Sequence, residues 1–217
     1  EEIEKEIVEN NLPYKKYSEN ELISTVAKLM EGENVIGWFQ GRMEYGPRAL
    51  GNRSIIADAR NKDNWKKVNL KIKFRESFRP FAPTVLEERS SEYFDLDRPS
   101  PYMLLVADVK PEKREEVPAI THIDGTARIQ TISASENSKY HSLISEFAKN
   151  TGCPVIINTS FNVRGEPIVE SPNNAINCFL HTQMDFLVLG NYIISKADLT
   201  GDLQKDNQAY LEKFELD

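Results

Sequence analysis

Cysteine is scarce in this chain. Two cysteines occur among 217 residues. Cys153 precedes a proline, and Cys178 lies in a helix-like stretch. Two such thiols form neither a disulfide framework nor a cysteine-based metal cluster. We therefore expect both to be buried as small apolar side chains.

Long apolar runs are also missing. The longest, at residues 103–107 and 155–157, are far shorter than the roughly 20 residues that cross a bilayer. No secretory leader is recognisable, and we expect a cytoplasmic protein with no membrane span. A hydrophobic content of 40% supports a packed core. The charged opening at Glu1, without a methionine, leads us to expect a linker over residues 1–17, cut from a longer polypeptide.

The charge is unevenly distributed. The whole chain has 27 basic and 34 acidic residues, a net charge of -7. Residues 41–80 hold eleven basic and four acidic side chains, a local net charge of +7, which leaves -14 for the remainder. Positive charge gathered in one segment of an acidic protein favours a site for a compact anion over a surface that coats a long nucleic acid.

The first candidate site is residues 41–53, here called the Gly-Arg loop. Its glycines and arginines are Gly41, Arg42, Gly46, Arg48, Gly51 and Arg53. Glycine lets backbone N–H groups approach a phosphate, and the arginine fork can donate two parallel hydrogen bonds to it. The loop lacks the Gly-Lys-Ser/Thr of a P-loop and the G-x-G-x-x-G of a dinucleotide site. Spacing alone therefore leaves a glycine-rich turn with solvated arginines as an equal alternative.

A second basic stretch, residues 71–83, alternates cations with aromatic residues and runs into prolines. In extended backbone Lys73 and Arg75 point to the same side. Two cations on one side repel each other, so a bound anion would offset them. The alternative is a helix C-terminus, where basic side chains interact favourably with the helix dipole.

Polar side chains follow an apolar strand expected at residues 154–158. Ser160, Asn162, Arg164 and Glu166 come directly after it, and open α/β sheets bind ligands at the carboxyl ends of their strands. These residues form a second candidate half-site. We expect Glu166 to orient an arginine rather than to act as a base.

A weaker signal lies at residues 121–130. Arg128 and Gln130 would share one face of a strand, and such a polar face is usually the solvated side of a sheet. We expect His122 and Asp124 to be structural partners of the neighbouring loop.

Helical and strand patterns alternate along the chain, which indicates an α/β fold. A capping box at Ser18 and Glu21 opens one helix, and Gly152 ends another. The expected helices are 18–31, 61–74, 87–94, 138–151 and 172–182, with a marginal one at 208–214. The expected strands are 35–39, 54–57, 84–86, 102–109, 128–132, 154–158, 186–189 and 192–194.

Four of these stretches together resemble a known family. Residues 37–54, 78–83, 122–128 and 158–168 are similar, in the same order, to the C-terminal domain of the nodulation-protein U and cephamycin carbamoyltransferase (NodU/CmcH) family. The resemblance covers about residues 34–196. It implies a YrdC-like open twisted mixed sheet flanked by helices over residues 18–197, with residues 198–217 as a tail.

The resemblance also implies an activity. Such domains use ATP, with Mg²⁺, and carbamoyl phosphate to form carbamoyl adenylate. Lys73 and Arg75 resemble the family's Lys-x-Arg pair, and Ser160 and Asn162 its Ser-x-Asn pair, so these residues are the expected catalytic set. Further anion-binding candidates are Arg48, Arg53, Arg79, Arg128 and Arg164.

The family's other half is missing from this chain. That half binds the acceptor and holds a metal through a His-x-x-x-His motif, but His122, His141 and His181 are nowhere four residues apart, so we expect no metal here. The domain should at most form the adenylate, for transfer to a small-molecule hydroxyl or amine bound by the missing N-terminal domain. Two alternatives remain open: a double-stranded RNA or tRNA binding module, and an inert interface domain whose apolar patch would favour self-association, as in a homodimer.

Overall fold

The computed structural model of the chain describes residues 1–73, 81–200 and 210. Within them the helices are α1 (Glu2–Glu9), α2 (Glu19–Glu31), α3 (Lys62–Lys71), α4 (Ser90–Tyr93), α5 (Ser138–Thr151) and α6 (Pro172–Leu180). The strands are β1 (Lys15–Lys16), β2 (Ile36–Phe39), β3 (Arg53–Asp58), β4 (Ala82–Leu86), β5 (Leu105–Asp108), β6 (Thr126–Ile132), β7 (Val155–Ser160), β8 (Phe186–Leu189) and β9 (Tyr192–Ser195).

All of these strands form one open, twisted, mixed sheet. Its nine strands lie in the order β1-β9-β8-β2-β3-β7-β4-β6-β5. The pairs β2/β8 and β4/β6 are parallel, and the other neighbouring pairs are antiparallel. The order places β7, late in the chain, between β3 and β4 at the centre of the sheet. Segments far apart in sequence therefore end side by side.

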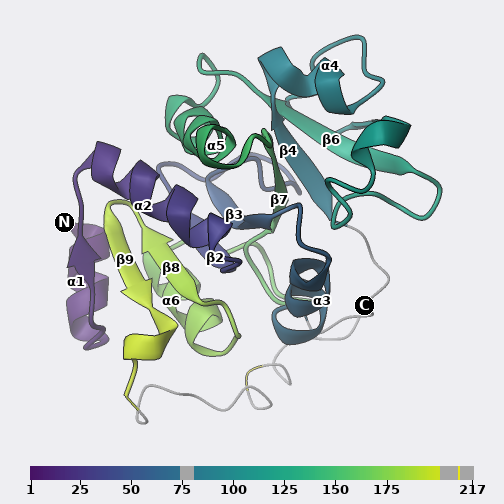
Figure 1. Cartoon of the computed structure of the whole chain (residues 1–217). Coiled ribbons are helices and arrows are strands. Elements are labelled where there is room, and N and C mark those ends of the chain that lie inside the picture. The colour runs from purple at the N-terminus through teal and green to yellow at the C-terminus, as the bar shows by residue number, and fades with distance from the viewer. Residues whose placement is uncertain (74–80, 201–209, 211–217) are drawn as a thin grey trace.

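Helices cover both faces of the sheet (Figure 1). On one face, α2 and α5 pack against the apolar side chains of Ile36, Trp38, Ile56 and Ile156. On the other face, α1, α3 and α6 contribute to a larger buried cluster that includes the sheet residue Ile157. The expected fold class is confirmed. No helix in the described part of the chain is long and apolar enough to span a bilayer.

The lead-in at residues 1–17 differs from the expected linker. Residues 2–9 form α1, and the fully buried Ile7 joins the core. Asn173 Nδ2 of α6 donates a hydrogen bond to Glu6 Oε2 at 3.0 Å, and Lys15 and Lys16 pair with β9. The lead-in is thus ordered because it carries apolar residues at helical spacing that find a partner surface in α6.

The expected apolar strand at residues 102–109 is shorter than predicted and is exposed. It forms β5, at the edge of the sheet. Tyr102, Leu104 and Val106 are 65%, 72% and 60% exposed. An apolar run usually indicates a buried strand. Here β5 is an edge strand, and among the described strands it pairs with β6 alone.

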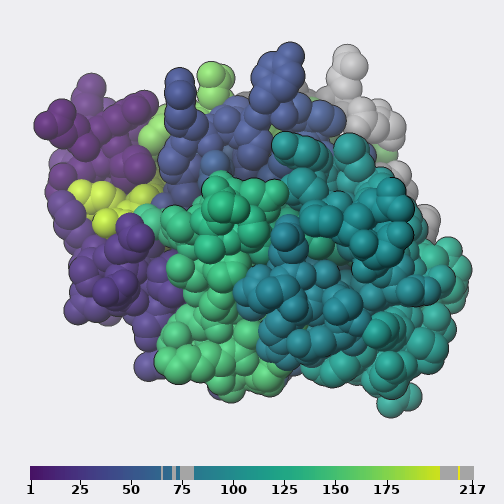
Figure 2. Space-filling model, turned by 90° about the horizontal axis from the view of Figure 1, so that it is seen from above, coloured from purple at the N-terminus to yellow at the C-terminus, as the bar shows by residue number. Residues whose placement is uncertain are grey.

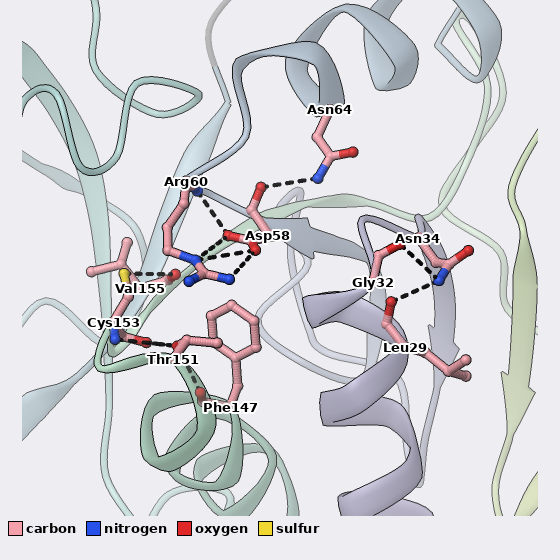
Figure 3. A network of polar contacts seen from close by, with 10 residues as sticks. All are labelled: Leu29, Gly32, Asn34, Asp58, Arg60, Asn64, Phe147, Thr151, Cys153 and Val155. Carbon is pink, nitrogen blue, oxygen red and sulfur yellow. Dashed lines mark hydrogen bonds and ion pairs between the residues drawn. The ribbon is translucent and has the colours of Figure 1, made fainter.

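Polar contacts close one end of the central strand β3. The buried carboxylate of Asp58, its last residue, is 2.7 Å from Arg60 Nη2 (Figure 3). Asn64 Nδ2 donates to the backbone oxygen of Asp58 at 3.3 Å. Arg53 begins the same strand, so the Gly-Arg loop lies at the opposite end.

Candidate functional site

The strand register brings the predicted half-sites to one end of the sheet. Phe39, the last residue of β2, pairs with Arg53, the first of β3. Ser160, the last of β7, pairs with Ser54. Ala82, the first of β4, pairs with Asn158. The Gly-Arg loop and the segment after β7 therefore leave the same end of the sheet, where β4 and β6 begin.

Lys73 joins the two half-sites that the sequence predicted. Its Nζ lies 3.2 Å from Ser160 Oγ, 2.6 Å from Asn162 Oδ1 and 2.8 Å from the backbone oxygen of Asn162. Ser160 Oγ donates to Asn162 Oδ1 at 2.7 Å. The Lys73 side chain is buried, at 4% exposed, and hydrogen bonds to charged groups in such places are among the stronger ones.

The segment after β7 is held in shape by its own polar groups. Asn162 Nδ2 donates to the backbone oxygen of Glu166 at 2.6 Å. Glu166 Oε2 accepts from the backbone N–H of Val163 at 2.8 Å, and its Oε1 accepts from the Tyr210 hydroxyl. The carboxylate of Glu166 thus stabilises its own loop, and the expectation that it orients an arginine stays a prediction. Arg164 is half-buried in this segment, and its anion-binding role stays a prediction.

The Gly-Arg loop is folded around Glu44. One carboxylate oxygen of Glu44 accepts from the backbone N–H groups of Leu50 and Asn52, at 2.8 and 2.6 Å. Asn52 Nδ2 donates to the backbone oxygen of Arg42 at 2.8 Å. Arg42 and Arg48 are exposed, and the loop's blue atoms project from the surface in the view from above (Figure 2).

Gly51 fixes where the loop rejoins the sheet. Its φ of +114° lies in the region that favours glycine, and a Cβ there would come within 2.3 Å of the Tyr140 ring. Trp38 Nε1 donates to its backbone oxygen at 2.8 Å. Only a residue without a side chain fits this position.

Arg53 is buried beneath the loop and organises it. Its guanidinium donates to the backbone oxygens of Gln40, Asn52, Gly41 and Glu170 at 2.7 to 3.3 Å. Burial lowers the pKa of Arg53, against the opposing effect of nearby carboxylates. Anion binding by Arg53 stays a prediction.

Arg48 and Arg128 bring two positive charges together at this end. Burial lowers the pKa of Arg128, and the charge of Arg48 lowers it further. Arg128 also helps lower the pKa of His122, although burial is the larger cause. Like charges placed together favour a bound anion. The Asp124 carboxylate accepts from the backbone N–H and the hydroxyl of Thr126, the first residue of β6.

A buried polar cluster on β4, β6 and β7 was not predicted from the sequence. It comprises Thr84, Gln130 and Asn158, which are at most 1% exposed. Gln130 was expected on a solvated face of its strand, but the Gly-Arg loop covers it. No local sequence pattern reveals this, because its partners lie up to 80 residues away.

Two expected site residues, Arg75 and Arg79, lie outside the described residues. The other seven, Lys73, Ser160, Asn162, Arg48, Arg53, Arg128 and Arg164, belong to segments that meet at the same end of the sheet. In the described part of the chain, no group of histidine, cysteine, aspartate and glutamate side chains could hold a metal ion.

A family model and several curated proteins match most of this chain in sequence. The family described as Carbamoyltransferase C-terminus matches residues 27–196. An uncharacterized protein of Synechocystis sp. is 50% identical over 94% of this chain and 36% of its own length. Nodulation protein NolO of Bradyrhizobium diazoefficiens is 48% identical over 82% of this chain and 33% of its own. The chain thus spans about a third of the length of these relatives.

Comparison with solved structures agrees with the fold. P. abyssi Sua5, solved in complex with L-threonine, superposes with a TM-score of 0.59 and 16% identity, covering 82% of this chain and 48% of Sua5. Full-length HypF, in a phosphate- and nucleotide-bound form, gives a TM-score of 0.55 and 20% identity, covering 79% of this chain and 25% of HypF. At these identities the similarity concerns the fold alone.

Proposed function

The chain belongs to the carbamoyltransferase C-terminus family, and from this premise we propose that it is the part of a carbamoyltransferase that binds ATP and carbamoyl phosphate and forms carbamoyl adenylate. The main support is structural. Lys73 contacts Ser160 and Asn162 at the end of the sheet where the charges of Arg48 and Arg128 also interact. One end of the sheet thus offers both fixed positive charge and neutral hydrogen-bonding groups.

The described contacts support different roles for these groups. The charges of Arg48 and Arg128 lie close enough that the first lowers the pKa of the second, so these two arginines are the proposed contacts for phosphate oxygens. Lys73 already binds oxygens of Ser160 and Asn162, so it holds these two side chains in place and adds positive charge nearby. Arg53, Arg164, Arg75 and Arg79 remain further candidates for anion contacts.

The proposed reaction needs positioning more than a protein nucleophile. Water first hydrolyses carbamoyl phosphate to carbamate and orthophosphate. A carbamate oxygen then bonds to the α-phosphorus of ATP, while the bond to the β-phosphate oxygen breaks and pyrophosphate leaves with the electron pair. Negative charge in this displacement spreads over phosphoryl oxygens, which arginines can stabilise.

Mg²⁺ would arrive with ATP in this proposal. Mg²⁺ is commonly bound by substrate phosphates and water, with one or two carboxylates.

Transfer to an acceptor is assigned to sequence outside this chain. The chain spans about a third of its curated relatives, so we propose that a further domain binds a small-molecule hydroxyl or amine and receives the carbamoyl group there.

Calorimetric titration with ATP, combined with a pyrophosphate-release assay in the presence of carbamoyl phosphate, tests the proposal. Arg128→Gln should weaken ATP binding about tenfold to a hundredfold, since a hydrogen bond to a charged group is worth roughly 1.5 to 3 kcal/mol. Arg42→Gln makes the same change at an exposed arginine of the Gly-Arg loop, so it is the control and should change binding by less than about twofold. Absence of both heat and pyrophosphate with the wild type would contradict the proposal.

The same titration separates this function from nucleic-acid binding. A nucleic-acid module would bind duplex RNA with a steep dependence of log affinity on log salt concentration. ATP binding that is lost in Arg128→Gln, without measurable affinity for duplex RNA, supports the nucleotide enzyme.

A further inference from the structure

Three buried polar side chains lie on neighbouring strands directly behind the site. Thr84 of β4 pairs with Gln130 of β6, and Asn158 of β7 lies one strand further along. Thr84 Oγ1 donates to Gln130 Oε1 at 2.7 Å, and Asn158 Nδ2 donates to the same oxygen at 2.8 Å. Buried polar groups are costly unless they are hydrogen-bonded. Thr84 Oγ1 also accepts from the Tyr140 hydroxyl of α5 at 3.3 Å, and the two amide nitrogens find further acceptors in the Gly-Arg loop.

The two amides hold the backbone of that loop. Gln130 Nε2 donates to the backbone oxygen of Leu50 at 2.9 Å, and Asn158 Nδ2 donates to that of Ala49 at 3.1 Å. Ala49 and Leu50 directly follow Arg48. Because Gln130 Oε1 accepts from Thr84 and Asn158, its amide nitrogen is left to point at the loop. The amides therefore fix the chain immediately after Arg48.

The same strands also carry the other site residues. Side chains two residues apart on a strand share a face, so Arg128 lies on the face of Gln130, and Ser160 on the face of Asn158. The hydrogen bonds of this cluster therefore connect three segments: the chain after Arg48, the start of β6 and the end of β7.

We propose that Gln130 and Asn158 are positioning residues that hold Arg48 beside Arg128 and Ser160, so that the three can bind one anion. Neither amide touches the ligand. The inference rests on the proposed function for the identity of that anion, the phosphate groups of ATP, while the positioning of the loop can be measured without any ligand.

Limited proteolysis measures the positioning directly. Trypsin cleaves after arginine, and cleavage of the Arg48–Ala49 bond requires that segment to leave the sheet, whereas the exposed Arg42–Met43 bond serves as a reference in the same loop. Mass spectrometry gives the ratio of the two cleavage rates. Gln130→Met removes the hydrogen bond to Leu50 at similar volume, and should raise the ratio roughly fivefold to tenfold. Thr84→Ser keeps the hydroxyl and should leave it unchanged.

Asp58→Asn separates positioning from general loss of stability. It weakens the Asp58–Arg60 contact at the far end of β3, so it should lower the unfolding temperature without changing the cleavage ratio or the affinity for ATP. In Gln130→Met, affinity for ATP should fall by a factor similar to the rise in the ratio, because Arg48 is no longer held in the binding position.

The outcomes are distinct. A ratio that Gln130→Met leaves unchanged, or that Asp58→Asn raises equally, overturns the positioning role. A raised ratio with unaltered ATP affinity also overturns it. If the wild type binds no ATP, the proposed function fails, and the cleavage ratio alone still decides whether the amides hold the loop.

Discussion

Lys73 Nζ lies 2.6 Å from Asn162 Oδ1, although 89 residues separate the two in sequence. The contact links the segment that follows α3 to the segment that follows β7. It also makes the Lys73 ammonium part of the structure of the site, because its hydrogen bonds reach Ser160 as well. The charge of Lys73 is therefore held at a fixed place before any ligand binds.

The first prediction concerns this lysine. Lys73→Met leaves the partly buried oxygens of Ser160 and Asn162 without their cation. It should lower the unfolding free energy by about 1 to 3 kcal/mol and abolish measurable ATP binding. Lys67→Met is the matched control on α3: its ion pair is with Asp185 and is partly exposed, so stability should change by roughly 1 kcal/mol or less. Chemical denaturation and calorimetry check both variants. Equal effects of the two substitutions would contradict a special role for Lys73.

The second prediction concerns the glycines of the Gly-Arg loop. Gly46 and Gly51 have nearly the same φ, +111° and +114°, but nothing lies within 4 Å of a Cβ at Gly46, whereas one at Gly51 meets the Tyr140 ring at 2.3 Å. Gly46→Ala should cost about 1 to 2 kcal/mol of stability through backbone strain. Gly51→Ala adds a steric clash and should cost more, by about 1 to 3 kcal/mol. Thermal unfolding of both variants measures the difference, and equal losses would show that the ring contact is unimportant.

The third prediction uses His122 as a reporter. Burial lowers the pKa of His122, with a smaller contribution from the charge of Arg128. A phosphate bound at Arg128 offsets that charge, so saturating ATP should raise the His122 pKa. Arg128→Gln should raise it without ATP, and ATP should then have no further effect. Proton NMR titration resolves this readily, since the chain has three histidines. A pKa of His122 that ATP leaves unchanged in the wild type would argue against phosphate at Arg128.

The fourth prediction concerns stability at alkaline pH. Burial lowers the pKa of Lys196 from 10.5 to about 8, and its ammonium lies over the Phe179 ring at 3.9 Å. Between these two values the unfolded chain binds more protons than the folded one, so this lysine contributes an increase in stability as pH rises from about 8 to 10.5. Subtracting the stability profile of Lys196→Met from that of the wild type isolates the effect. A difference that stays flat over this range would contradict the shifted pKa.

Much of the fold could be predicted because local and tertiary preferences agree. The helix at residues 138–151 has the predicted bounds, with Gly152 at a φ of +82° as its cap. Both cysteines are buried, as expected, and burial raises the pKa of Cys153 to about 11. The helix and its cap depend on residues that are close together in sequence. Cysteine is among the residue types most often buried, whatever its sequence neighbours.

The predictions of burial that were wrong share one physical cause. Whether a side chain is buried depends on residues that are distant in sequence. The apolar residues Tyr102, Leu104 and Val106 are exposed, because they lie in β5 at the sheet edge or just before it. Gln130 is polar yet buried, because the Gly-Arg loop covers it. Ile7 is buried in a segment expected to be a linker, because α1 has a partner in α6.

The site could be predicted in part for a similar reason. The motifs around Arg48, Lys73, Arg128 and Ser160 are recognisable in sequence, whereas their convergence follows from the strand order. The positioning amides of Gln130 and Asn158 belong to no motif and are visible only once β4, β6 and β7 lie side by side.

A crystal structure of the chain with a non-hydrolysable ATP analogue would show where the triphosphate binds. We expect phosphate oxygens within hydrogen-bond distance of both Arg48 and Arg128, at the sheet end that carries Ser160 and Asn162. A triphosphate bound at another surface, with these four side chains free of it, would contradict the proposed function.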